Sequence, residues 1–192
     1  MSKAASVLRD GGVIIYPTET LYGIGTLALI EKYVRKVFEV KGRDYNKPLP
    51  VLFKNLDQLS HYIRLDSFGR KLAEKFLPGP LTLISEQKIY MPSLISAGTG
   101  KIACRISSNN FVAELLDILD EPITSTSANI SNSPNLFRSD DIIKLFSNKV
   151  DLIVDSGSLP DSKGSTIIDI TTSPPLVVRE GDIGKEELLE FI

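Results

Sequence analysis

The sequence predicts a single α/β domain built on a mixed sheet. Short apolar runs typical of strands alternate with stretches of helical periodicity through most of the 192 residues, as in proteins whose strands are connected by helices. Residues 166–170 and 176–179 are two strand-like runs with no helix between them, so at least one pair of strands is expected to be antiparallel. Because no segment rich in glycine, proline or serine divides the chain, residues 1–192 are interpreted as one domain.

In the first half of the chain, strand and helix alternate. The expected elements are a strand at 13–16, a helix at 30–41, a strand at 49–53 and two short helices after Asn55 and Asp66. The first strand is an apolar run that Pro17 stops. The first helix has apolar residues every three or four positions and ends at Gly42. Asn55 and Asp66 have the side chains that favour N-cap positions.

The second half contains more strands than helices. The expected elements are strands at 81–84 and 102–106, a helix from Asn109 or Asn110 to Leu119, a strand at 122–126, a helix at 140–146, strands at 151–154, 166–170 and 176–179, and a helix at 186–192. The strands are short apolar runs bounded by turn residues, which is the usual strand pattern. An asparagine before residue 111 accepts a backbone hydrogen bond and so favours a helix start.

The composition excludes several classes of protein. Hydrophobic residues make up 42% and charged residues 24% of the chain, as in ordinary globular proteins. The single cysteine, Cys104, permits no intrachain disulfide and fits a reducing compartment. We find no secretory signal and no apolar run near the roughly 20 residues that span a membrane. The expected location is therefore the cytoplasm, with no membrane partner.

Charge is distributed unevenly along the chain. The net charge is only −2, yet residues 31–54 contain seven Lys and Arg against three acids. Such a local positive field indicates a small anionic ligand, or RNA along one face. His61 is the only histidine, so a histidine metal cluster is excluded, and no metal site made by the protein is expected. The chain also lacks a Walker-type phosphate loop.

Five polar clusters remain as candidates for a site. They lie at residues 17–25, 41–49, 125–131, 163–169 and 179–182. Ligands of α/β proteins bind in loops at strand ends, where several of these clusters are expected. The cations of the second cluster suit a triphosphate, although the negative end of a helix dipole equally favours cations there. The other clusters are also compatible with ordinary turns and helix caps.

Taken in order, these clusters resemble the YrdC/TsaC family, the threonylcarbamoyl-AMP synthases. The matching pieces are Gly11-Gly12, Pro17–Gly25, Lys41–Leu49, Pro78–Thr82, Arg105, Ser125–Ser131, Ser165–Asp169 and Arg179–Asp182. The resemblance implies a twisted mixed sheet with flanking helices around a basic cavity. It also implies a nucleotidyl transferase that forms L-threonylcarbamoyladenylate and pyrophosphate from ATP, L-threonine and bicarbonate. Downstream tRNA threonylcarbamoyl transferase proteins then use this adenylate to make threonylcarbamoyladenosine in tRNA.

The same resemblance implies roles for individual residues. Threonine is expected near Thr18, Arg105, Ser125 and Thr166. ATP is expected near Lys41, Arg43, Lys47, Ser127, Asn129 and Arg179, with Lys41 and Arg43 also catalytic. Mg²⁺ is expected to arrive with ATP, held mostly by phosphate and water oxygens.

The chain departs from the family pattern at several positions, and two other functions stay open. The departures are Asp44, Leu52, Lys101, Ser107 and Asn132. The main alternative is a non-enzymatic module that binds tRNA or double-stranded RNA, because a basic cavity also suits a phosphate backbone. The other is a carbamoyl-adenylate former of the hydrogenase-maturation kind. Enzymes of that kind are long multidomain chains with zinc-finger cysteines, whereas this chain has one cysteine.

Overall fold

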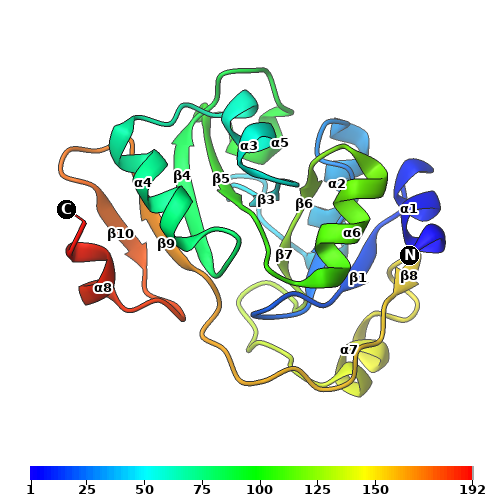
Figure 1. Ribbon diagram of the computed structural model, residues 1–192. Coiled ribbons are helices and arrows are strands. Elements are labelled where there is room, and N and C mark those ends of the chain that lie inside the picture. The colour runs from blue at the N-terminus through cyan, green and yellow to red at the C-terminus, as the bar shows by residue number, and fades with distance from the viewer. Residues whose placement is uncertain (192) are drawn as a thin grey trace.

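The computed structural model describes residues 1–191, and its ten strands form two twisted mixed sheets (Figure 1). The smaller sheet has the order β7 (Thr126–Ser127), β2 (Gly23–Gly25), β1 (Ile14–Tyr16), β8 (Leu152–Ile153). The larger sheet has the order β10 (Leu176–Arg179), β9 (Thr166–Asp169), β4 (Leu81–Glu86), β5 (Lys101–Arg105), β3 (Val51–Leu52), β6 (Ile123–Thr124). Both contain parallel and antiparallel pairs, so the predicted mixed α/β class is confirmed.

Eight helices accompany these strands in the described part of the chain. They are α1 (Ser2–Arg9), α2 (Glu31–Lys41), α3 (Leu56–Tyr62), α4 (Ser67–Phe76), α5 (Ser93–Ser96), α6 (Asn110–Leu119), α7 (Ser139–Phe146) and α8 (Lys185–Leu189). Within residues 1–191, no helix has both the length and the apolar character that a membrane span requires.

The predicted helix ends are confirmed by their capping contacts. The Asn55 side chain accepts a hydrogen bond from the Gln58 amide at 2.8 Å, at the start of α3. Asp66 caps α4 in the same way, and Asn109 caps α6. Gly42 ends α2 in a left-handed conformation with φ of 58°, which glycine adopts without a steric penalty.

Four elements were not predicted from the sequence. No element was expected where α1, β2 and α5 lie, and β7 was not expected as a strand separate from β6. β2 is a three-residue Gly-Ile-Gly strand and β7 has two residues. Segments this short contain too few residues for a periodic pattern. The predicted strand at 122–126 is divided between β6 and β7, and the last residue of the predicted helix at 186–192 lies outside the described residues.

The two sheets are joined where the chain leaves β2. Residues 26–28 run beside β6: the Thr124 amide donates to the Thr26 carbonyl at 2.8 Å and the Ala28 amide to the Pro122 carbonyl at 2.9 Å. β6 belongs to the larger sheet, while β7, which follows it, pairs with β2 of the smaller one. Two chain segments therefore pass together from one sheet to the other, which holds the sheets at a fixed relative position.

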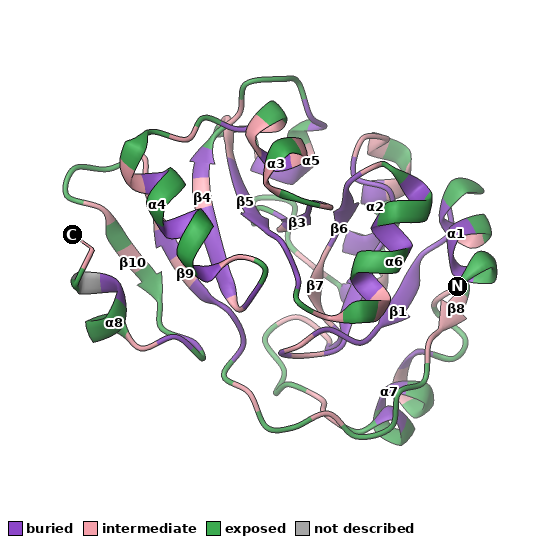
Figure 2. Ribbon diagram, viewed as in Figure 1, coloured by how far each residue is buried: buried purple, intermediate pink, exposed green. Residues whose placement is uncertain are grey.

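Helices α3 and α4 cover one face of the larger sheet (Figures 1 and 2). Leu59 of α3 and Leu72 of α4 are fully buried in the same apolar cluster as Leu83 of β4 and Cys104 of β5. Near the other end of the chain, the ring of Phe191 packs edge-on against Phe76 of α4, with centroids 5.5 Å apart. The opposite face of this sheet is left to form a cavity.

A second apolar cluster packs α1 and α6 together. Leu8 of α1 and Leu116 of α6 are almost fully buried against Ile14 and Tyr16 of β1. This cluster covers the smaller sheet on the side of the N-terminus (Figure 2). The short α1 is therefore stabilised by packing on β1 and α6, because an isolated helix of that length is not stable.

Candidate active site

A cavity of about 340 Å³ lies between the two sheets. Its lining consists of Thr18, Thr20, Leu21, Tyr22, Gly23, Arg43, Pro48, Pro50, Leu52, Thr82, Ile84, Ala103, Arg105, Ser125, Thr126, Ser127, Asn135, Gly164, Ser165, Ile167, Val178 and Arg179. Three arginines are among these residues, while no aspartate or glutamate of the described chain is. The cavity is therefore basic, as the family resemblance implies.

Strand alternation explains which residues face the cavity. Leu83, Cys104 and Ile168 are paired across the sheet and are buried in the apolar core. Side chains of successive residues point to opposite faces of a strand, so the neighbours Thr82, Ala103 and Ile167 face the cavity instead. The floor of the cavity thus mixes apolar side chains with a few polar ones, which is typical of small-molecule sites.

Arg105 lies at the end of β5 and is the most buried of the three arginines. Its side chain is 10% exposed and forms an ion pair with Glu19 at 2.9 Å. The same Nη2 donates to the Thr20 hydroxyl at 3.3 Å. Ser107 donates a short hydrogen bond to the same carboxylate oxygen of Glu19. Arg105 is thus held by acceptors on the segment that follows β1.

The loop after β1 is ordered by Thr18. Its hydroxyl donates to the Leu21 carbonyl at 2.6 Å and accepts from the amides of Thr20 and Leu21, each at 3.2 Å. The hydroxyls of Thr18 and Thr20 lie 3.1 Å apart. Two hydroxyls and the Arg105 guanidinium therefore line the same part of the cavity, a set suited to a carboxylate with a neighbouring hydroxyl.

Arg43 and Arg179 come from distant parts of the chain. Arg43 follows α2 and donates from Nη2 to the Pro48 carbonyl at 2.7 Å. Arg179 ends β10 and donates from Nη2 to the Ser165 carbonyl at 2.6 Å. Burial lowers the pKa of both guanidinium groups, and for Arg179 the charge of Arg105 lowers it further. These bonds use only part of the five N–H donors of each group, so donors remain for an anion.

Lys41 occupies a different position from the one expected of a phosphate contact. It is 2% exposed and is not among the cavity residues. Its Nζ donates to the carbonyl oxygens of Ser127 and Asn129 and to the Asn129 side-chain oxygen, the last two at 2.8 and 3.0 Å. Three acceptors match the three N–H donors of an ammonium. In this structure, Lys41 therefore holds the loop that follows β7.

The expected site residues divide into two groups. The cavity is lined by Thr18, Arg43, Arg105, Ser125, Ser127 and Arg179. The residues outside the lining are Lys41, Lys47, Asn129 and Thr166. Lys47 is exposed and its Nζ donates to Asn132 at 3.3 Å. The side-chain oxygen of Asn129 accepts from the Ser127 hydroxyl at 2.7 Å, so Asn129 orients a residue that does line the cavity.

Thr166 is the first residue of β9 and lies beneath the site. Its fully buried hydroxyl donates to the Ile183 carbonyl at 2.6 Å and accepts from the amides of Gly181 and Ile183 at 2.9 and 3.1 Å. The hydroxyl therefore has three partners within the protein. They fix the turn after β10, the strand that carries Arg179.

Sequence reasoning missed several residues that shape the cavity. Thr20 lies in a cluster that was noticed, yet was not assigned a contact. Thr82 of β4 and Ser165, the residue before β9, have hydroxyl oxygens 2.8 Å apart in the lining, although they are 83 residues apart in the sequence. A signal existed in the motifs that contain them, but their meeting depends on the parallel pairing of β4 with β9.

The departures from the family pattern have structural explanations in part. Asn132 adopts a left-handed conformation with φ of 66°, which asparagine tolerates better than most residues. Lys101 forms an ion pair with Asp169 at 3.4 Å, and Leu52 adds apolar lining. The Asp44 carboxylate accepts from the Asn46 amide at 2.9 Å. Ser107 contacts Glu19, as described above.

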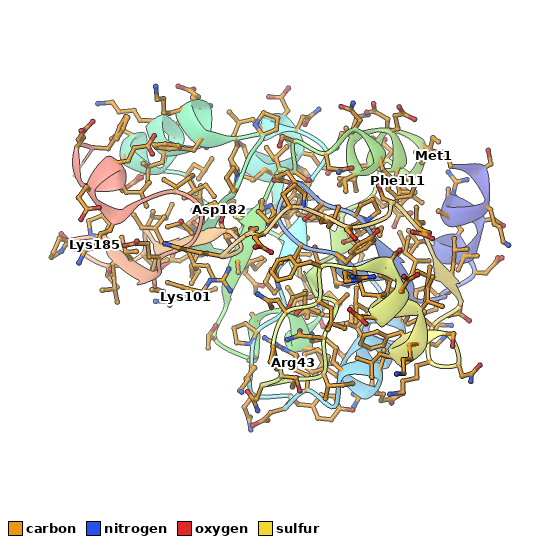
Figure 3. All side chains as sticks on the ribbon, turned by 90° about the horizontal axis from the view of Figure 1, so that it is seen from below. Met1, Arg43, Lys101, Phe111, Asp182 and Lys185 are labelled. Atoms are coloured by element: carbon orange, nitrogen blue, oxygen red, sulfur yellow. The ribbon has the colours of Figure 1, made fainter. Side chains whose placement is uncertain are left out.

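A long segment crosses the open side between the two sheets, and we call residues 155–164 the strap (Figure 1). Tyr22, a cavity residue, donates to the Gly157 carbonyl at 2.8 Å. Near the other end of the strap, the Asp182 carboxylate accepts from the Lys163 amide at 2.8 Å. Figure 3, seen from below, labels Arg43 on the side of α2 and Asp182 on the side of α8. The strap is thus hydrogen-bonded to the loop after β1 through Tyr22 and to the turn after β10 through Asp182.

Comparisons with known proteins agree with this geometry. A family model for Sua5, YciO and YrdC proteins, described as "Telomere recombination", matches residues 6–181. Threonylcarbamoyl-AMP synthase of Pyrococcus abyssi is 34% identical over 190 residues, which is 98% of this chain and 56% of that protein. A putative threonylcarbamoyl-AMP synthase of Methanocaldococcus jannaschii is 38% identical over 181 residues, which is 94% of this chain and 85% of that protein.

A solved structure is similar over the same length. The crystal structure of P. abyssi Sua5 complexed with L-threonine matches with a TM-score of 0.94 at 33% identity, and the match covers 99% of this chain and 56% of that one. The chain thus spans little more than half of the P. abyssi protein. The matched family model covers nearly all of the described fold, and the resemblance read from the sequence is confirmed: this chain belongs to the Sua5/YciO/YrdC family.

Proposed function

We propose that this chain is a threonylcarbamoyl-AMP synthase, which forms L-threonylcarbamoyladenylate and pyrophosphate from ATP, L-threonine and bicarbonate. The observation that carries the proposal is the presence of Arg43, Arg105 and Arg179 in one cavity of about 340 Å³. Arg105, with the hydroxyls of Thr18 and Thr20, suits the carboxylate and hydroxyl of threonine. Arg43 and Arg179 suit the phosphates of ATP. Relatives with this name and a relative's complex with L-threonine support the assignment.

The reaction needs positioning and charge stabilisation more than acid–base groups. The threonine nitrogen bonds to the carbon of bicarbonate with loss of water, which gives a carbamate. A carbamate oxygen then attacks the α-phosphorus, and the bond to pyrophosphate breaks. Holding both substrates in one cavity makes this attack effectively unimolecular, which contributes roughly 7–11 kcal/mol in favourable cases. Arg43 and Arg179 stabilise the charge that develops on the departing pyrophosphate.

Magnesium enters this proposal as part of the substrate. No carboxylate of the described residues lines the cavity, and residues 1–191 contain no group of three or more potential metal-binding side chains. This donor set fits an ion that phosphate and water oxygens hold, as Mg²⁺ usually is with ATP. The role of the protein residues is then to bind the phosphates through Arg43, Arg179 and Ser127.

The proposed product determines the partners and the location. A threonylcarbamoyl adenylate is an activated carbamate, so a transferase that acts on tRNA must receive it before water does. We therefore extend the proposal to downstream tRNA threonylcarbamoyl transferase proteins as partners and to the cytoplasm as the location. The proposal includes direct contact with tRNA only at the step in which the threonylcarbamoyl group is transferred from the adenylate to tRNA.

The test follows pyrophosphate release by the purified protein with ATP and Mg²⁺. The proposal expects release that requires both L-threonine and bicarbonate. Arg43→Ala is expected to lower kcat/KM about 10- to 150-fold, which corresponds to a lost charged hydrogen bond of about 1.5–3 kcal/mol. Arg35→Ala, which removes an exposed arginine paired with Glu31 on α2, is the matched control and is expected to leave the rate unchanged.

The outcome also separates the alternative function. Release that is absent with threonine, together with salt-sensitive binding of tRNA, would replace the enzyme by an RNA-binding module. Release that is present but equal in Arg43→Ala would keep the activity and remove Arg43 from the phosphate site.

A further inference from the structure

Glu19 is a buried acid beside the cavity to which the proposed reaction gives no role. Its side chain is 14% exposed, and its Oε2 accepts from Arg105 at 2.9 Å. Ser107 donates to the same oxygen, and the Asn109 amide at the start of α6 donates to Ser107 at 3.2 Å. Glu19 is therefore fixed from two sides, and Arg105, which lines the cavity, is its contact on the cavity side.

The ion pair leaves two buried polar atoms without hydrogen bonds, which is unusual. Within the described chain, Glu19 Oε1 and Arg105 Nε are both buried and have no hydrogen-bond partner. A buried acceptor without a partner is costly, so a site that serves only stability would favour a fully bonded arrangement. The arrangement instead keeps a full negative charge close behind a cation that lines the cavity.

We propose that Glu19 is a specificity-determining residue, which neutralises Arg105 so that its part of the cavity accepts a zwitterionic amino acid and rejects multiply charged anions such as phosphate. This inference rests on the proposed function, because it assigns that part of the cavity to threonine. Glu19 acts through Arg105 and is not itself a contact of the reacting atoms.

The physical reason is the balance of charge around a bound carboxylate. The guanidinium offers directed N–H donors to a carboxylate whether or not Glu19 is charged. Glu19 repels any anion on the far side of Arg105, and this repulsion doubles for a dianion. An amino acid also carries an ammonium, which Glu19 attracts. The Glu19–Arg105 pair therefore favours binding of threonine over binding of phosphate groups, which are abundant in the neighbouring ATP region of the same cavity.

The test measures binding and needs no catalysis. Inorganic phosphate at pH 8 is titrated by calorimetry into the wild type, Glu19→Gln, Arg105→Gln and the double variant. Glu19→Gln is expected to bind phosphate on the order of tenfold more tightly than the wild type, because it removes one charge near the anion. The gain is expected to vanish in the double variant, which distinguishes the Arg105 region from phosphate binding at Arg43 and Arg179.

The matched control is Glu31→Gln, which removes an exposed glutamate from its pair with Arg35 and is expected to leave phosphate binding unchanged. Equal or weaker binding by folded Glu19→Gln, or a gain that persists in the double variant, overturns the proposal. Should Glu19→Gln not fold, the wild type is titrated with L-threonine and with its 2-hydroxy analogue, which lacks the ammonium. Equal affinity for the two overturns the proposal, and weaker binding of the anionic analogue supports it. Because these titrations need no turnover, failure of the synthase reaction is recognised separately by pyrophosphate release.

Discussion

At the scale of single residues, Lys41 illustrates what a sequence leaves open. The sequence places this lysine in a cluster of cations, whereas in the structure it lies outside the cavity lining, with its Nζ against three oxygen acceptors. The orientation of the Lys41 side chain depends on the carbonyl oxygens of Ser127 and Asn129, which are 86 and 88 residues away in the chain. A motif identifies the chemistry of a side chain, whereas its partners are set by the fold. For the same reason, Arg43 and Arg105 reach the cavity while Thr166 does not.

The burial of Lys41 predicts a pH dependence of stability. Burial, and secondarily the charge of Arg43, lowers the pKa of Lys41 to about 7, whereas a lysine in an unfolded chain has a pKa of about 10.4. The unfolded state therefore binds more protons between these values, so the contribution of Lys41 to stability rises with pH in that window. Below pH of about 7 both states are protonated, and the cost of burying the charge is fully present.

The comparison with Lys41→Met isolates this contribution. Burial also raises the pKa of Tyr16 and of Cys104. At high pH these two groups make the free energy of unfolding fall as pH rises, and they do so in both the wild type and Lys41→Met. Urea unfolding at pH 7, 8 and 9 is expected to show a free energy of unfolding that rises in the wild type relative to Lys41→Met. Parallel pH curves for the two proteins would contradict a buried lysine of lowered pKa.

Thr166 gives a second prediction at this scale. Replacement by valine leaves the buried amides of Gly181 and Ile183 without their acceptor, so the free energy of unfolding is expected to fall by about 1–3 kcal/mol. The KM for threonine is expected to stay that of the wild type, and Thr166→Ser, which keeps the hydroxyl, is expected to retain stability. A valine variant with normal stability and a raised KM would instead make Thr166 a substrate contact.

At the scale of elements, local signals determined what could be predicted. α2, α3, α4 and α6 were found because caps and apolar periodicity lie within each segment. The division of the strands into two sheets was not predicted, because it depends on the crossing of residues 26–28 with β6. Gly25 stands at this crossing: a Cβ there would lie 2.0 Å from the Thr124 carbonyl oxygen. No short-range pattern in the sequence carries that contact.

This close approach predicts that Gly25→Ala is destabilising. The added carbon forces β2 away from β6, and overpacking of this kind costs about 1–3 kcal/mol or more. Gly184→Ala is the matched control, because its nearest atom is the flexible Glu186 carboxylate at 3.6 Å, and only a smaller loss of about 0.5–1 kcal/mol is expected there, since alanine is a poorer N-cap than glycine. Thermal unfolding of both variants checks the prediction, which equal midpoints would contradict.

At the scale of the whole molecule, the cavity joins the two sheets. Gly23 of β2 and Ser127 of β7 belong to the smaller sheet, and Thr82, Arg105 and Arg179 to the larger one. The sequence predicted the α/β class. Of the ten site residues that were predicted from the sequence, six lie in the cavity lining, because each motif is next to a recognisable element. The enclosure of the cavity by two sheets depends on pairings over the whole chain.

A ligand that contacts both sheets is expected to stabilise the molecule as a unit. With MgATP and threonine at about 100 times their dissociation constants, binding to the folded state adds about 2.7 kcal/mol per independent site. Scanning calorimetry is expected to show one transition that moves to higher temperature. A separate transition that stays at the temperature of the free protein would show that part of the fold is not coupled to the site.

The parallel pairing of β9 with β4 has a consequence for the protein during its synthesis. β4 ends at Glu86, while β9, its neighbour in the sheet, begins at Thr166. A nascent chain emerges from the ribosome N-terminal end first, so one edge of β4 stays unpaired until about eighty further residues have followed. Open strand edges attract other strands. A chain that stops before Thr166 is therefore expected to have an open β4 edge and an incomplete cavity, and to pair with other strands more readily than the full chain.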